Sequence, residues 1–172
     1  MKNKSFKIPL IISGAVTAVI CAVMNFYLIP LIESTTEGIK CFDMNFGYSY
    51  DDAVKFLSLL SETGRNTYLR IQLPLDFVYP IAYCVFFSLL IVTLMKKKSA
   101  LILLPAVLAV TDYCENICTV IMLKSSAPSR QLVSFASTVT QVKTVLMYVC
   151  FILIAILIIY GIINKIKNKK NG

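Results

Sequence analysis

The sequence contains no histidine, and charged residues make up only 15% of its 172 positions. Without histidine the chain cannot form a Ser-His-Asp or Cys-His nucleophile pair, a His-ligated zinc site or a haem site with a proximal histidine. The six cysteines include no C-x-x-C pair, and all except Cys41 lie in apolar runs. This pattern disfavours a secreted disulfide framework and a membrane thiol oxidoreductase. We therefore expect no cofactor and assign no metal ligands.

Apolar residues, in contrast, are abundant. Hydrophobic residues make up 58% of the chain, and the mean hydropathy is +0.77. A soluble domain has about 45–50% apolar and about 25% charged residues, so this composition argues against a soluble globule, a disordered chain or a nucleic-acid-binding domain. Four apolar runs are long enough for a helix that crosses a bilayer core about 30 Å thick. They predict one all-α membrane domain, a four-helix transmembrane bundle with spans at about residues 8–32, 75–95, 101–123 and 142–163.

The distribution of basic residues predicts the orientation of these spans. Three short segments carry ten basic and no acidic residues: the N-terminal tail (Lys2, Lys4, Lys7), Lys96–Lys98 and the C-terminal tail (Lys165, Lys167, Lys169, Lys170). The loop Glu33–Asp76 carries four basic and seven acidic residues. By the positive-inside rule both termini are cytoplasmic, and the long loop faces outward. We expect a multi-pass protein of the cell membrane, the cytoplasmic membrane of a bacterium. The first apolar run exceeds a signal-peptide core, which favours a retained helix.

The outer loop contains one segment with a helical pattern. Ser49 and Asp52 fit a capping box with aspartate in place of glutamate, apolar residues follow at helical spacing, and Gly64 suits the position after a helix. This predicts an extracellular amphipathic helix at about residues 50–63. It either packs as a lid across the bundle or lies in the headgroup layer; we favour the lid, because a basic polar face is missing.

Two helix starts stay open at this stage. The second span either begins with Pro74 in its first turn or belongs to a longer helix that starts near Asn66 and kinks at Pro74. The fourth helix is expected to begin before the membrane, with Ser126 or Ser129 as its cap.

The third predicted span contains a costly polar stripe. Asp112, Glu115 and Asn116 share one helical face. Each acid costs about 2.5–3.5 kcal/mol at the centre of a membrane helix, if glutamate behaves like aspartate. The stripe must therefore face other helices or water rather than lipid.

Polar residues from the other segments lie at a matching depth, toward the outer half of the bundle. The inner halves of the second and fourth spans are nearly free of polar residues. This asymmetry predicts a polar cavity that opens outward above a dry base. Its expected ligand-binding residues are Asn25, Arg65, Tyr68, Asp76, Tyr79, Tyr83, Asp112, Glu115, Asn116, Gln141 and Lys143.

Several functions fit this cluster. The favoured function is binding of a lipid headgroup, a small molecule or an ion, with or without linked proton exchange by the carboxyl groups. The alternative is a structural or regulatory membrane subunit, in which pairs such as Lys143 with Glu115 or Asp112, and Arg65 with Asp76, only hold the helices together. A less favoured alternative is an intramembrane enzyme that uses its carboxylates, for which we assign no catalytic residue. The expected partners are membrane lipids and, if the protein transports, a second copy of the chain or another membrane protein; nucleic acid is not expected.

The motifs also carry a resemblance. The string G-R-x-x-Y (Gly64, Arg65, Tyr68) is followed by Asp76, Pro80 and Tyr83, by D-x-x-E-N (Asp112, Glu115, Asn116) and by Lys143. This order resembles a pattern of uncharacterised bacterial four-span integral membrane proteins. The resemblance implies the four-span fold over most of the chain and assigns no activity.

Overall fold

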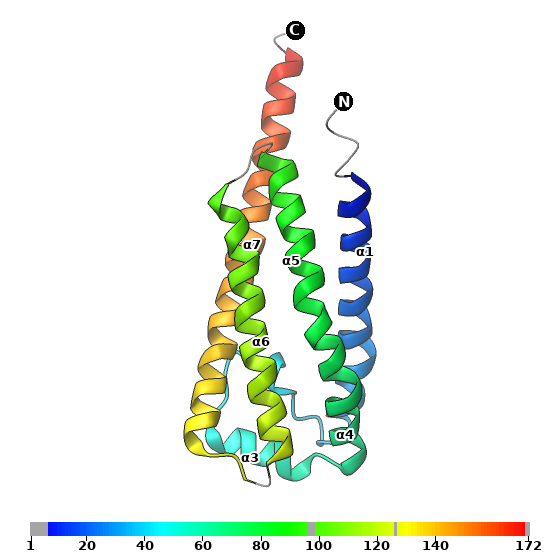
Figure 1. Ribbon diagram of the computed structural model, residues 1–172, viewed down its shortest axis with the longest axis vertical. Coiled ribbons are helices and arrows are strands. Elements are labelled where there is room, and N and C mark those ends of the chain that lie inside the picture. Colours follow the sequence, from blue (N-terminus) through cyan, green and yellow to red (C-terminus); the bar gives the residue numbers. More distant parts are fainter. Residues whose placement is uncertain (1–6, 96–98, 126, 171–172) are drawn as a thin grey trace.

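The structure, a computed structural model, describes residues 7–95, 99–125 and 127–170. Within these ranges all regular structure is helical. The described residues form four helices long and apolar enough to cross a membrane, Lys7–Glu33, Glu62–Met95, Ala100–Lys124 and Arg130–Ile163. Figure 1 shows them side by side in an elongated bundle. The expected all-α bundle with four apolar helices is therefore confirmed.

Each long helix is built from shorter elements. In chain order these are α1 (Lys7–Val23), the π-helical turn η1 (Met24–Leu28), α2 (Ile29–Glu33), η2 (Phe42–Met44), α3 (Tyr50–Leu59), α4 (Glu62–Thr67), the π-helical turn η3 (Tyr68–Gln72), α5 (Leu73–Met95), η4 (Ala100–Ile102), α6 (Leu103–Lys124) and α7 (Arg130–Lys170). The lysines behind the predicted orientation are largely outside this description: Lys2, Lys4 and Lys96–Lys98 lie outside the described residues, as do the side chains of Lys165, Lys167, Lys169 and Lys170.

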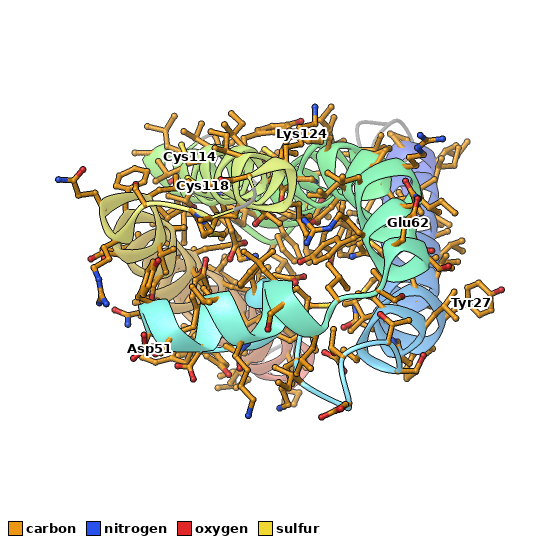
Figure 2. All side chains as sticks on the ribbon, turned by 90° about the horizontal axis from the view of Figure 1, so that it is seen from below. Tyr27, Asp51, Glu62, Cys114, Cys118 and Lys124 are labelled. Carbon is orange, nitrogen blue, oxygen red and sulfur yellow. The ribbon has the colours of Figure 1, made fainter. Side chains whose placement is uncertain are left out.

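Helix α3 lies across one end of the bundle, which we call the loop end, and the chain termini lie toward the other end (Figures 1 and 2). Its start has the expected capping box: the Asp52 N–H donates to Ser49 Oγ (3.1 Å), and the Ser49 N–H donates to the Asp52 carboxylate (3.0 Å). Hydrogen bonds from the Ser49 side chain and backbone hold the pKa of the Asp52 carboxyl below its ordinary value.

The end of α3 differs from the expectation. The helix stops at Leu59 rather than near residue 63, and Gly64 lies inside α4 instead of following α3. The reason is a second N-cap, because Ser61 Oγ accepts the Gly64 N–H (3.0 Å) and starts α4. Gly64 is needed for close packing: a Cβ at this position would collide with the Thr35 side chain.

The two open helix starts are settled by the structure. Residues Glu62–Met95 form one continuous helix that begins before Asn66 and contains Pro74 and Pro80 in its interior. Helix α7 begins at Arg130, where Ser129 Oγ accepts the Leu132 N–H (3.2 Å). Its 41 residues span about 60 Å, roughly twice the thickness of a bilayer core. In Figure 1 its last turns extend beyond the rest of the bundle.

The buried apolar residues form two separate clusters. One lies toward the loop end and joins α3 to the bundle through residues such as Phe56, Met122 and Val133. The other lies toward the termini and contains Phe87, Leu108 and Cys150, among others. Between them, on α5, α6 and α7, comes a set of buried polar side chains. We call it the polar layer: Asp76, Asp112, Glu115, Asn116, Thr140 and Lys143.

Candidate functional site

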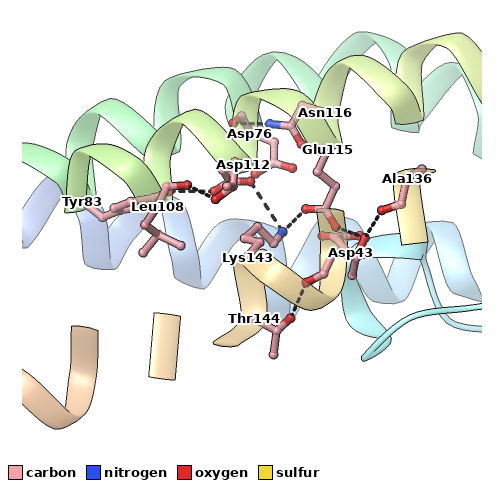
Figure 3. A network of polar contacts seen from close by, with 12 residues as sticks. Asp43, Asp76, Tyr83, Leu108, Asp112, Glu115, Asn116, Ala136, Lys143 and Thr144 are labelled. Carbon is pink, nitrogen blue, oxygen red and sulfur yellow. Dashed lines mark hydrogen bonds and ion pairs between the residues drawn. The ribbon is translucent and has the colours of Figure 1, made fainter. Parts of the chain in front are cut away.

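Lys143 is the central residue of the polar layer. Its side chain projects from α7 toward α6, where Nζ forms ion pairs with Glu115 and with Asp112 (3.5 Å to Oδ1), as Figure 3 shows. Glu115 also accepts a hydrogen bond from the Thr140 hydroxyl (2.5 Å). All these side chains are buried. The polar-layer charges of these two helices, Asp112, Glu115 and Lys143, therefore face one another and not the surrounding medium.

The second long helix joins this network through Tyr83. The Tyr83 hydroxyl, on α5, donates to the Asp112 carboxylate (3.0 Å), and both side chains are buried. Asp112 thus has a hydrogen-bond donor on one side and the Lys143 ammonium on the other, which offsets part of the cost of burying its charge.

Pro80 explains the position of Asn116. A proline lacks the N–H that would bond the carbonyl four residues earlier, which here is the carbonyl of Asp76. The Asn116 side chain on α6 donates to that carbonyl (2.8 Å), and the Tyr113 hydroxyl donates to the next carbonyl, that of Phe77 (2.9 Å). Side chains of α6 therefore satisfy the backbone of α5 where the proline interrupts it.

The charges in this region do not balance. Asp76 is buried in the polar layer. Asp43, on η2 of the loop, lies half-buried beside the layer and accepts a hydrogen bond from the Tyr68 hydroxyl (3.1 Å). In the part of the chain that the structure describes, neither of these carboxylates forms an ion pair. Of the four carboxylates in this region, only Asp112 and Glu115 pair with the Lys143 ammonium.

Two buried polar groups next to the layer have no hydrogen-bond partner among the described residues. They are the side-chain amide of Gln72, at the end of η3, and the Tyr48 hydroxyl in the loop. Burial, together with the nearby Glu115 carboxylate, raises the pKa of the Tyr48 phenol well above its ordinary value. Tyr48 therefore stays a neutral hydrogen-bonding group at any physiological pH.

Other expected site residues lie elsewhere. The Arg65 guanidinium donates to the carbonyls of Leu123 and Leu57 (3.1 Å to the latter), so it caps the C-terminal turns of α6 and α3 and makes no ion pair with Asp76. Asn25 is exposed on the first long helix, and its amide donates to the Cys21 carbonyl of the same helix (2.9 Å).

The remaining expected residues border the network. Tyr79 packs edge-to-face on Tyr83, with ring centroids 5.1 Å apart. Gln141 is exposed at the loop end and lies against Gly47. Gly47 has a φ of 117°, a backbone conformation that glycine adopts readily.

The surface pockets described in the structure lie at the loop end. They have volumes of about 410, 280 and 220 Å³, and the last two share Tyr48 as a lining residue. Side chains of the polar layer line none of these three pockets. The apolar cluster beneath α3 lies between the layer and the loop end. Entry from this side therefore requires a movement of the loop.

Sequence reasoning missed Asp43 and Gln72. For Gln72 a signal was present, because Tyr68, Gln72 and Asp76 recur every four residues on one helix. For Asp43 we find no such signal: it is one acid among several in the loop, and only the folded path of the loop brings it to the bundle.

Comparison of the chain with family models, curated proteins and solved structures gives no match. The resemblance to bacterial four-span membrane proteins therefore stays a prediction, and function has to follow from geometry and charge.

Proposed function

We propose that this protein is a multi-pass protein of the cell membrane whose polar layer binds a small cationic ligand or exchanges protons. The observation that carries the proposal is the charge imbalance: among the described residues Lys143 pairs with two carboxylates of the polar layer, while Asp76 in the layer and Asp43 beside it have no ion pair. Unpaired buried charge is costly, and it is neutralised by a proton, a cation or a partner group. A site with too few positive charges of its own therefore favours a positively charged occupant.

The proposed orientation has both termini in the cytoplasm and α3 outside, on the basis of the lysine distribution. In this orientation the layer communicates with the exterior through the loop that carries Asp43 and Tyr48. A bacterial cytoplasmic membrane is the proposed location. The proposed route to the polar layer opens toward the exterior. The apolar cluster near the termini closes the layer on the opposite side.

A structural role is the second candidate, and one observation favours it. Tyr83, Thr140 and Asn116 each find a partner across a helix interface, as expected of side chains that hold helices together. In that case Asp76 would be one more buried polar residue, and its replacement would only loosen the bundle.

Replacement of Asp76 by asparagine separates these candidates. The titratable and charged groups around Asp76 are Asp112 and Glu115 on α6, Lys143 on α7, Asp43 in the loop, and Tyr68, Tyr79 and Tyr83 on its own long helix. If the layer carries excess negative charge, Asp76→Asn relieves repulsion. The unfolding temperature at pH 8 in choline chloride then rises by about 3 °C, equivalent to roughly 1 kcal/mol. If the folded layer binds protons more tightly than the unfolded chain does, the wild-type unfolding temperature falls as the pH rises, and the variant shows a flatter profile.

The measurement is circular dichroism of the purified protein in nanodiscs, because the chain lacks tryptophan. Glu37→Gln removes an exposed acid from the same loop and serves as the matched control, with no expected change. A lower unfolding temperature for Asp76→Asn at every pH would support the structural role instead.

A further inference from the structure

Gln72 is a buried amide that the proposed network does not use. Its side chain is 0% exposed, and neither its nitrogen nor its oxygen has a hydrogen-bond partner in the described part of the chain. Buried amides in native proteins are normally paired, so an unpaired one calls for an explanation. The amide oxygen is an acceptor, and carboxamide oxygens are common ligands of hard cations.

The local backbone places Gln72 among carboxylates. It ends the π-helical turn η3, which contacts the π-helical turn η1 of the first long helix. Such turns are rare and frequently mark functional sites. Tyr68, which binds Asp43, precedes Gln72 by four residues, and Asp76 follows it by four, so the three buried side chains line one face. Along this face Gln72 comes between Tyr68, whose hydroxyl donates to the Asp43 carboxylate, and Asp76, and neither carboxylate has an ion pair among the described residues.

We propose that Gln72, Asp76 and Asp43 form a subsite for a small monovalent cation, with Gln72 Oε1 and the carboxylate oxygens as its ligands. The inference rests on the proposed function and names its ligand class. Lys143 already forms ion pairs with Asp112 and Glu115, whereas Asp76 and Asp43 have none among the described residues, so we place the added positive charge beside the latter two. No three acidic or cysteine side chains of the described residues are grouped as in a metal centre, so the subsite lacks the several carboxylates typical of divalent-ion sites.

Tyr48 marks the entrance to this subsite. It lines both smaller loop-end pockets, and its buried hydroxyl has no partner among the described residues. The Tyr48 N–H donates to the Ser137 hydroxyl on α7 (2.9 Å), which ties the loop to the bundle at this point. A cation that enters from a loop-end pocket would pass the Tyr48 hydroxyl before it reaches Asp43.

The test is thermal unfolding of the full chain in phosphatidylcholine nanodiscs at fixed pH and ionic strength, with sodium, potassium, ammonium or choline chloride. We expect one small cation to raise the unfolding temperature above the choline value by about 5 °C at saturation. Gln72→Met removes both amide atoms at similar volume and should abolish this difference, whereas Gln72→Asn should weaken it. Gln131→Met makes the same change at an exposed position and should preserve it.

Three results would overturn the inference. The first is the same unfolding temperature in every salt, and the second is a rise with magnesium or calcium only. The third is a Gln72→Met protein that is more stable in all salts and keeps the cation effect, which would mean that the amide is only hydrated. If the pH response of the Asp76 experiment persists while the cation effect is absent, this inference fails and the proposed function stands. Absence of both the pH response and the cation effect refutes both this inference and the proposed function.

Discussion

At the scale of single residues, Asn116 and Pro80 act as a pair although they lie on different helices. The proline leaves the Asp76 carbonyl without its helical donor, and the Asn116 amide replaces that donor at 2.8 Å. Each residue is costly alone, because a proline disrupts a helix and an asparagine is unfavourable in a membrane span. Together they fix the depth of α6 against α5, and with it the position of Asp112.

This pairing predicts a coupling in a double-mutant cycle. Asn116→Leu should destabilise the protein by about 1 kcal/mol, because it leaves a buried carbonyl without a donor. In a Pro80→Ala background the alanine N–H can bond that carbonyl, so the same Asn116→Leu change should cost less. Unfolding free energies measured by SDS titration provide the comparison.

Tyr113→Phe is the control for this cycle, since it removes a side-chain donor to the neighbouring Phe77 carbonyl and leaves Asn116 intact. Equal costs of Asn116→Leu in both backgrounds would show that the asparagine does not act through the proline.

At the scale of elements, α3 depends on its first turn. The helix has ten residues, which is short for stability on its own, and the reciprocal hydrogen bonds of Ser49 and Asp52 satisfy two backbone groups at its start. Its apolar side is buried through Ala53, Phe56 and Leu57. The cation–π contact of Arg130 with the Tyr50 ring (4.2 Å) connects the same turn to α7. This helix covers the loop side of the polar layer, so under the proposed function its stability would control access to that layer.

Removal of the cap should therefore have a pH-dependent effect. Ser49→Ala should lower the free energy of unfolding by about 1 kcal/mol at pH 7. The pKa of Asp52 is lowered in the folded protein, so its contribution is present above the ordinary aspartate pKa and is lost as the pH falls through the folded value. The difference between wild type and variant should shrink near pH 3. Ser58→Ala, which removes an exposed hydroxyl that bonds only the Lys55 carbonyl, is the control. A difference in unfolding free energy between wild type and Ser49→Ala that stays constant from pH 7 to pH 3 would argue against this role of the Asp52 carboxylate.

At the scale of the whole molecule, the two ends of the bundle are chemically different. The loop end carries α3, the acidic loop and the surface pockets, and the other end carries both termini. The basic residues in the tails and in Lys96–Lys98 predict that the terminal end is cytoplasmic. Access to the polar layer would then be from the exterior, past the loop.

A labelling experiment in intact cells tests this orientation. A cysteine at the exposed position of Glu37 should react with a membrane-impermeant maleimide, whereas a cysteine added after Gly172 should react only after lysis. The native loop cysteine, Cys41, is fully buried, and burial raises the pKa of its thiol, so it should give little background. The reverse labelling pattern would place α3 in the cytoplasm and would require a different route to the site.

The sequence alone determined the number of long apolar helices, the capping box of α3 and the polar stripe on α6, because these follow from residue composition and from the helical repeat. It also pointed to Lys143 as a partner of Asp112 and Glu115, since unpaired charge is costly in a membrane. Only the tertiary structure decided where Arg65, Asn25 and Asp43 lie. Arg65 donates to helix carbonyls, and Asn25 is exposed on the first long helix. Asp43 contacts the bundle from the loop, through the Tyr68 hydroxyl. Their positions depend on helix rotation and on the folded path of the loop, and these are set by packing among distant segments rather than by local residue order.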